Sequence, residues 1–171
     1  MPDPGLAAAV AREAAWLSSC GDGLPALPTS AGGPFDVVQP YMPRTPAQRQ
    51  TQLYVLRRST VTRRFSAQRR IATHTLLLSI WWPIGATAQS GGTSLAESEQ
   101  AALDAAVALV VARIEGTVTD KTHGGRFLSV AEAPDESAGV RVDMGDPAQG
   151  IQAGALTAQI TYMADDKNYV A

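Results

Sequence analysis

The chain has 171 residues, 45% of them hydrophobic and 18% charged, and a formal net charge of −2 at pH 7. This length supports one hydrophobic core but not two full domains, and no apolar run is long enough to cross a bilayer. Cys20 is the only cysteine, which excludes an internal disulfide and a thiolate metal cage within one subunit. Because Asp3, Arg12 and Glu13 interrupt the apolar residues at the start of the chain, we expect no secretory signal and synthesis in the cytoplasm.

Basic and acidic residues are segregated along the chain. Between Val37 and Ala96 there are eight arginines and no acidic residue, whereas the rest of the chain holds all sixteen acidic residues and six basic ones. This polarity favours contact with a polyanion or with the acidic body of a second copy, because complementary charges set orientation and encounter rate. The eight residues are Arg44, Arg49, Arg57, Arg58, Arg63, Arg64, Arg69 and Arg70.

A helix is predicted over residues 4–19. Its apolar side chains recur every three to four positions, at Leu6, Val10, Trp16 and Leu17, which is typical of a helix packed on one face. The glycines that follow are expected to end this helix.

A proline-rich arm is predicted next, over residues 21–50. Six prolines lie between Gly21 and Pro46, so few backbone donors are available and regular helix is excluded. We expect an extended, surface-running segment with a short strand within residues 34–38. Since six prolines make this stretch stiff, it would hold a fixed course over the domain or reach a partner.

Two adjacent strands are predicted over residues 52–65 and 71–82, joined by a turn at residues 66–68. Both are rich in β-branched and aromatic residues, and the second is apolar enough to lie in the middle of a sheet. Side chains of the second strand are expected to alternate between two faces. One face carries His74, Leu76, Leu78, Ile80 and Trp82, and the other carries Ile71, Thr73, Thr75, Leu77, Ser79 and Trp81.

The arginines of the first strand come in neighbouring pairs, Arg57-Arg58 and Arg63-Arg64. Since neighbouring side chains of a strand point to opposite faces, each pair places one guanidinium on either side of the sheet. A strand buried on both faces cannot hold such pairs. We therefore expect the basic end of the hairpin, around residues 63–70, to project beyond the packed middle.

The clearest helix is predicted to begin at Ser94, after a flexible stretch at residues 85–93. Ser94 and Glu97 form an S-x-x-E capping box, and Gly116 is expected to end the helix. One face is apolar and is expected to pack on the sheet. This face consists of Leu95, Leu103, Ala106, Val107, Val110, Val111 and Ile114.

Three short strands are predicted in the last third of the chain, over residues 126–131, 140–143 and 155–163. Alternation in the third of them is typical of a sheet with one buried face. The glycine-rich stretch at residues 144–154 is expected to be a mobile loop, and residues 164–171 a polar tail.

The order of these elements indicates an α+β fold. We expect an antiparallel or mixed sheet of four or five strands, with the long helix and the N-terminal helix packed on it. The chain should form a single domain in four parts: an N-terminal helix at 1–20, the arm at 21–50, an α+β core at 51–163 and the tail at 164–171.

The residues give no sign of a catalytic or metal site. The chain lacks both glycine-rich phosphate-binding motifs. His74 and His123 are far apart in sequence, and neither has a cysteine or carboxylate at metal-ligand spacing. Cys20 with either histidine would supply a nucleophile and a base, but no neighbouring residue supports that pairing. We therefore expect no enzyme activity, no catalytic residue, no cofactor and no metal.

The arginine-rich hairpin has three interpretations. As a nucleic-acid site it would contact phosphates, with Tyr41, Tyr54 and Phe65 stacking on bases, but the acidic pI of about 5.6 opposes this. It could also be an ordinary solvated hairpin. Contact between subunits is favoured, because it explains both the basic hairpin and the acidic remainder of the chain.

The acidic residues available for such contact lie in predicted loops without calcium-loop spacing, so they are solvated or reserved for a partner's arginines. These clusters are Asp135-Glu136, Asp143 with Asp146, and Asp165-Asp166. The residues predicted for the interface are Arg57, Arg58, Arg63, Arg64, Arg69, Arg70, Asp143, Asp146, Asp165 and Asp166.

Several segments carry a family resemblance when they are taken in order. They are QLYVLRRSTVTRR, ATHTLLLSIWWPIG, LDAAVALVVARIEG, GRFLSV after a glycine turn, and LTAQITYMADD. Over residues 50–166 the chain resembles tail terminator proteins of long-tailed (siphovirus-type) phages, especially those that infect actinobacteria. The proline-rich segment before residue 50 departs from the pattern of that family.

The resemblance implies an α+β virion protein without enzyme activity or cofactor. Such proteins form a ring, expected here to be a homohexamer, that caps the completed tail tube, stops its polymerisation and provides the docking surface for the head connector. The implied partners are other copies of the chain, the tail tube protein and a head-side connector or stopper protein. DNA would pass through the ring without specific binding, and no membrane is involved. The implied location is the head-proximal end of the tail, at the neck, after assembly in the host cytoplasm.

Three other functions fit part of this pattern. A head-completion or neck connector protein would share the ring and the charge polarity. A tail tube subunit is also α+β, but it polymerises by stacking. A nucleic-acid-binding module would bind with an affinity that falls steeply as salt rises.

Overall fold

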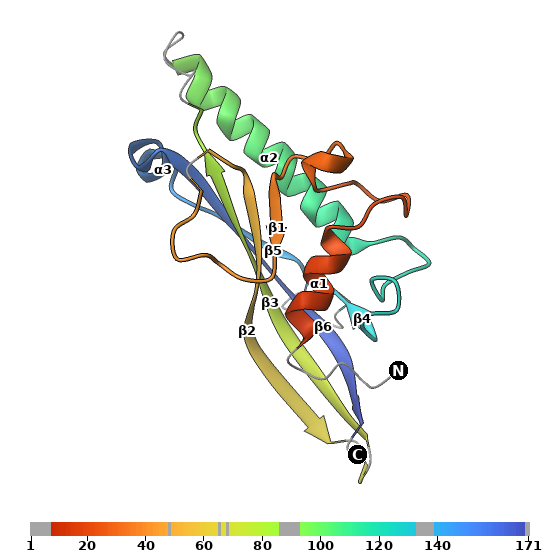
Figure 1. Ribbon diagram of the computed structural model, residues 1–171. Helices are drawn as coiled ribbons and strands as arrows, with labels where there is room; N and C mark the ends of the chain where they lie inside the picture. Colours follow the sequence, from red (N-terminus) through yellow and green to blue (C-terminus); the bar gives the residue numbers. More distant parts are fainter. Residues whose placement is uncertain are drawn as a thin grey trace.

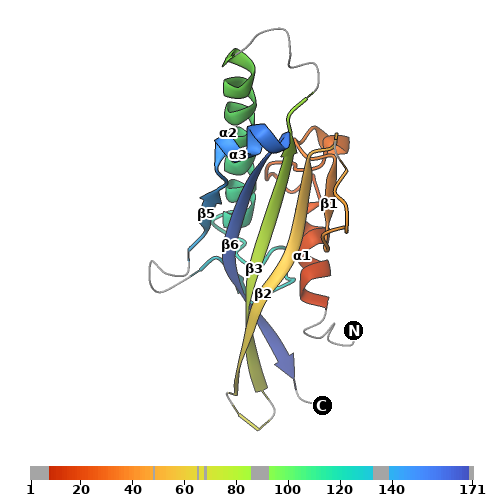
Figure 2. The same cartoon turned by 90° about the vertical axis from the view of Figure 1, so that its left-hand side faces the viewer.

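A curved mixed sheet forms the centre of the computed structural model, and helices α1 (Ala9–Leu17) and α2 (Thr93–Glu115) lie on one of its faces (Figures 1 and 2). The fold is therefore α+β, as predicted. The structure describes residues 8–47, 49–64, 66–67, 69–85, 93–132 and 139–169. Its other elements are η2 (Thr29–Ala31), β1 (Val37–Gln39), β2 (Gln52–Arg64), β3 (Arg69–Pro83), β4 (Ser129–Val130), β5 (Arg141–Met144), α3 (Pro147–Ala153) and β6 (Ala155–Tyr169).

The sheet has six strands rather than the four or five predicted. Its order is β1, β2, β3, β6 and β4, and β5 pairs with β6 as well. β1 runs parallel to β2, whereas the other pairs are antiparallel. β3 pairs with β6 from Arg69 opposite Tyr169 to Pro83 opposite Ala155, so β3 lies centrally, as predicted.

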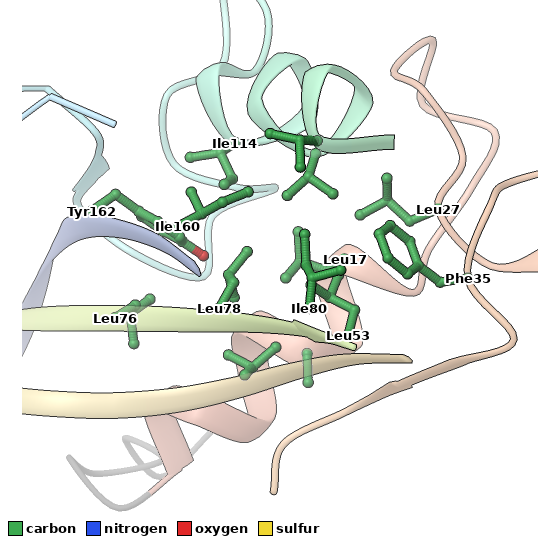
Figure 3. Packing of buried hydrophobic residues seen from close by; sticks show 14 of the residues in the cluster. Leu17, Leu27, Phe35, Leu53, Leu76, Leu78, Ile80, Ile114, Ile160 and Tyr162 are labelled. Carbon is green, nitrogen blue, oxygen red and sulfur yellow. The ribbon is translucent and has the colours of Figure 1, made fainter. Parts of the chain in front are cut away.

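The core fills the space between the helices and one face of the sheet. Leu76, Leu78 and Ile80 of β3 are buried, and the residues between them are partly exposed, which confirms the predicted alternation. Figure 3 shows these side chains facing Ile114 of α2 and Ile160 of β6. Burying one such side chain stabilises the fold by about 1.5–3 kcal/mol. The buried face of α2 is Leu103, Ala106, Val107, Val110 and Ile114, with Val111 partly buried against it.

The proline-rich arm is extended as predicted, but it is not confined to the surface. Leu27 and Phe35 are fully buried in the core cluster. Phe35 N donates to the Leu27 carbonyl at 2.9 Å, and Thr29 N donates to the Phe35 carbonyl at 2.8 Å. The short strand predicted after them is β1. Residues 21–39 are therefore anchored on their own domain.

Residues 144–154 were predicted to be a loop, and this is wrong because α3 occupies most of them. Asp146 is the N-cap and accepts a hydrogen bond from Ala148 N at 2.9 Å, and Pro147 occupies the first helical position. Gly154 ends the helix with a φ of 78°, a conformation that favours glycine.

The prediction of a polar tail from residue 164 is also wrong, because β6 continues to Tyr169. Pairing along nearly all of β3 supplies the backbone partners that a polar sequence needs in order to stay in a strand. Of the strand predicted at residues 126–131, the structure has only the two residues of β4.

Some predictions fall outside the described part of the chain. They concern Leu6 in the first helix, Phe65 in the hairpin, the flexible stretch at residues 86–92, the side chains of Ser94 and Leu95, and the Asp135-Glu136 cluster.

Beyond the helices, β2, β3 and β6 continue as a ribbon that projects from the body (Figures 1 and 2). β3 has 15 residues, so it is roughly 50 Å long at its usual rise per residue. No helix in the described ranges is long and apolar enough to span a membrane.

Substitution of Gly33 tests the anchoring of the arm. A Cβ at this position would lie 2.2 Å from the backbone carbon and oxygen of Leu27. Because backbone must move to make room, we expect Gly33→Ala to lower the free energy of unfolding by about 1–3 kcal/mol. In the control Gly139→Ala the new Cβ has nothing within 4 Å, so stability should change by less than about 0.5 kcal/mol. Equal denaturation curves for the two variants would contradict the anchoring.

Candidate functional site

The predicted arginine surface lies on the projecting half of the β2–β3 hairpin, which we call the arginine ribbon (residues 57–64 and 69–75). Residues 52–55 of β2 are buried, whereas residues 57–59 and 61–64 are exposed. Arg57, Arg58, Arg63, Arg64 and Arg70 are thus on the surface, while the side chain of Arg69 lies outside the described residues.

A β-bulge marks the start of the arginine ribbon. The register of β2 against β3 shifts between Arg57 and Ser59, so Arg58 is an extra residue without a partner directly opposite. Bulges bend a strand and increase its twist. In Figure 1, β2 curves as it leaves the body. The bulge therefore aims the ribbon away from the part of the sheet that the helices cover.

At the end of the ribbon, Arg64 lies directly opposite Arg70. Like charges at directly opposed positions destabilise an antiparallel pair. No carboxylate in the described ranges pairs with Arg58, Arg63, Arg64 or Arg70. The repulsion between Arg64 and Arg70 is therefore not offset by a carboxylate of the described residues. Such uncompensated charge is typical of a surface that binds a partner.

Where the ribbon leaves the body, Arg12 of α1 binds Asp166 of β6. Arg12 Nη2 donates to Asp166 Oδ2, and Nη1 donates to Oδ1 at 3.3 Å and to the Arg126 carbonyl at 2.6 Å. The Arg12 guanidinium also lies 4.9 Å from the ring centroid of Phe127. Asp166 is only 5% exposed, so this ion pair is inside the protein.

His74 of β3 extends this contact across the sheet. It is fully buried, and its Nδ1 lies 2.9 Å from Thr60 Oγ1 of β2. Its Nε2 lies 3.5 Å from Asp166 Oδ2, which is long for a hydrogen bond. Burial raises the pKa of Asp166, but His74 and Arg12 outweigh it, so the net pKa lies below its ordinary value. An ionised Asp166 therefore links the three ribbon strands to α1, and we call this group the ribbon clamp (Arg12, Thr60, His74 and Asp166).

A second buried polar group lies next to the ribbon clamp. Glu13 accepts a hydrogen bond from the Tyr162 hydroxyl, and its Oε2 lies 2.9 Å from His123 Nδ1. His123 Nε2 donates to the Ile114 carbonyl at 2.9 Å, and Trp16 stacks on the imidazole at 3.5 Å between centroids. Burial first, and then the Glu13 carboxylate, raise the pKa of Tyr162 well above its ordinary value. This group joins α1, α2 and β6 without access to solvent.

Arg113 of α2 holds the chain that follows α1. It is fully buried, and its Nη2 donates to the Trp16 carbonyl at 2.8 Å and to Asp22 Oδ2 at 2.9 Å. Its Nη1 donates to the Pro25 carbonyl at 3.0 Å. Its guanidinium lies 4.6 Å from the Trp16 ring centroid. This side chain therefore fixes the start of the proline-rich arm.

Two of the acidic residues predicted for the interface are exposed, but they are structured. Asp143 lies in β5 and forms an ion pair with Arg141 at 2.9 Å. Asp146 caps α3. Asp143 thus lies in a strand, as predicted for residues 140–143, and Asp146 lies in the predicted loop region but caps a helix.

The other two predicted acids lie in β6, and their assignment to a tail is wrong. Asp165 is partly buried and accepts a hydrogen bond from Thr73 Oγ1 at 2.6 Å. Asp166 is buried in the ribbon clamp. The structure therefore removes Asp166 from the surface available to a partner.

Sequence reasoning did not assign roles to Arg12, Glu13 or Arg113. A signal for Glu13 exists, because Ala9, Glu13 and Leu17 are spaced four residues apart and lie on one buried face of α1. The two arginines carry no comparable signal, since their carbonyl and carboxylate partners are distant in sequence.

The described ranges contain no group of three or more His, Cys, Asp or Glu side chains that could hold a metal ion. His74 and His123 are each used in a different buried group, and Cys20 is exposed. Comparison of the chain with protein-family models and with curated proteins gives no match. A functional proposal therefore depends on the geometry of this chain and on its family resemblance.

Removal of the Asp166 charge tests the ribbon clamp. Asp166→Asn leaves the partly buried Arg12 guanidinium without its counter-charge and should lower the free energy of unfolding by about 2–4 kcal/mol at pH 7. The control Asp143→Asn breaks the exposed ion pair with Arg141 and should change the free energy of unfolding by less than about 1 kcal/mol.

The loss in Asp166→Asn should also depend on pH. The pKa of Asp166 is lowered on folding. Its stabilisation is therefore present above the unfolded pKa of about 3.9 and is lost as pH falls through the folded value. The free energy of unfolding, measured with denaturant, should differ less between wild type and Asp166→Asn at about pH 3 than at pH 7. A difference that does not change with pH would contradict an ionised clamp.

Proposed function

We propose that the chain is a tail terminator of a long-tailed phage, whose copies close into a ring on the last layer of the tail tube. The polarity of the folded subunit carries this proposal. Arg58, Arg63, Arg64 and Arg70 project on one ribbon without carboxylate partners in the described ranges, while exposed Asp143 and Asp146 lie on the body. The resemblance over residues 50–166 supplies the family, and the α+β fold is compatible with it.

A ring requires two different surfaces on each subunit. Each copy must present one face that complements another face of the next copy, and the rotation between them must close. Segregated charge suits this need, because it disfavours contact between like surfaces and sets the register of unlike ones. The arginine ribbon would supply one of the two surfaces.

Ring closure also requires that every subunit hold its interface at the same angle. The ribbon clamp meets this requirement, because it ties β2, β3 and β6 to α1 at the base of the ribbon. A ribbon free to swing would produce open chains as readily as closed rings. We therefore assign the clamp a positioning role.

The mechanism is steric. The ring covers the growing edge of the tube protein, so that no further layer adds, and its opposite surface binds the head-side connector. The DNA passes through the ring without a specific site. Nothing in this mechanism needs a catalytic residue or a cofactor.

Electron microscopy of particles from an infection in which the gene is silenced tests this function. Overlong tails beside filled, unjoined heads are expected. Tails of normal length that fail to join, or heads that leak DNA, would make the protein a head-side connector instead. Absence of tails would indicate a tail tube subunit.

Charge reversal at the end of the ribbon tests its role. Arg63→Glu combined with Arg64→Glu should leave the free energy of unfolding within about 1 kcal/mol of wild type, because both side chains are exposed. The same variant should fail to form rings and to cap tubes.

The double variant Arg44→Glu and Arg49→Glu is a matched control. It changes the net charge equally, at exposed positions outside the arginine ribbon. Negative-stain microscopy and light scattering should show rings for this control. Rings of normal size from the Arg63 and Arg64 variant would remove the ribbon from the mechanism.

A further inference from the structure

A cleft lies between α2 and the segment that runs from β5 into α3. Its volume is about 220 Å³. Leu103 and Leu156 form apolar walls, together with Met144, which is 47% exposed. Asp104 and Gln100 of α2 add polar groups to this lining. The cleft is therefore an apolar slot with a carboxylate in its wall.

The segments that border this cleft carry mostly acidic charged residues. In residues 93–112 and 142–164 every charged residue is acidic. Arg141, just before this range, forms an ion pair with Asp143. Asp104 and Asp146 have no ion pair with a basic side chain in the described ranges. The acidic residues are Glu97, Glu99, Asp104, Asp143 and Asp146.

The size and chemistry of the cleft suit one long cationic side chain. Small-molecule sites usually enclose roughly 300–1,000 Å³, so this cleft is small for a cofactor. An arginine combines an apolar stem with a planar cation that binds carboxylates through two hydrogen bonds. Apolar walls would hold the stem, and Asp104 would bind the guanidinium.

We propose that this cleft is the docking site for the arginine ribbon of a second copy of the chain. Charge complementarity identifies this occupant. Arg58, Arg63, Arg64 and Arg70 of the ribbon are exposed and lack carboxylate partners in the described ranges, and the cleft is an apolar slot whose charged lining residue is Asp104. The ribbon also exposes Val61 by 55%, which adds apolar surface to the contact.

The same chain cannot make this contact with itself. α3, which borders the cleft, lies toward one end of the molecule, and the arginine ribbon projects from the other end (Figures 1 and 2). The contact must therefore be head-to-tail between copies, which yields a closed ring or an open filament. The inference rests on the proposed ring and names its subunit interface.

Reversal of charge in the cleft gives the first test. Asp104 is exposed on α2, so Asp104→Arg should leave folding intact. The substitution should weaken the self-association constant, measured by sedimentation velocity, at least tenfold. Glu115→Arg is the matched control, because it reverses an exposed acid at the C-terminal end of the same helix, outside the cleft lining, and should associate like wild type. Wild-type association by Asp104→Arg, or a wild-type chain that stays monomeric at its highest soluble concentration, would overturn the proposal.

Mixing variants gives a sharper test. The Arg63→Glu, Arg64→Glu chain keeps an intact cleft, and the Asp104→Arg chain keeps an intact ribbon. Each alone should be monomeric, whereas an equimolar mixture should recover association with the two variants alternating, because the intact cleft accepts the intact ribbon and the reversed cleft accepts the reversed ribbon. A single chain with all three substitutions should recover association, because the charges are exchanged. A mixture that remains monomeric would overturn the proposal even if both variants fold.

These outcomes separate the interface from the function. Rings that depend on Asp104 but do not cap tubes would keep this interface and reject a tail terminator. Tube capping that is unchanged by Asp104→Arg would keep the terminator and reject this interface. Binding of single-stranded DNA that is kept in Asp104→Arg but lost in the Arg63→Glu, Arg64→Glu chain would assign the ribbon to nucleic acid instead.

Discussion

The buried ion pair between Arg12 and Asp166 is the contact on which the shape of this protein depends. β2, β3 and β6 are much longer than the core that covers them, and the strand ends carry polar and basic residues that no helix buries. Left alone, such a ribbon is only marginally stable in water. The clamp anchors all three strands at the point where they leave the body, and the low pKa of Asp166 keeps the pair charged near neutral pH.

Because the ribbon is anchored, the charge segregation in the sequence becomes a separation of basic and acidic surfaces on the folded subunit. The clamp and the bulge at Arg58 hold the arginine ribbon away from the body, while Asp104 lies on the body, in the cleft between α2 and α3. A subunit with unlike ends favours one relative orientation of its neighbours. A small number of charged positions can therefore govern assembly without any catalytic group.

Much of the fold could be predicted from periodicity, and much of the site could not. The alternation of apolar side chains predicted β3, and the apolar face from Leu103 to Ile114 predicted α2. Both predictions hold because local spacing determines which face of an element is buried. The sequence does contain signals for α3, which are Asp146 before it, Pro147 at its first position and Gly154 after it, but the glycine content of this stretch favoured a loop. Asp166 was placed in a tail, since its partner Arg12 is 154 residues away and no local pattern links them.

Cryo-electron microscopy of the purified chain mixed with growing tail tubes tests the central claim most directly. The proposed assembly predicts one closed ring on a single end of each tube, with every arginine ribbon seated in the α2–α3 cleft of the next subunit, and no further tube growth at that end. Tubes that keep growing with the protein unbound, or rings whose subunits meet through other surfaces, would contradict it.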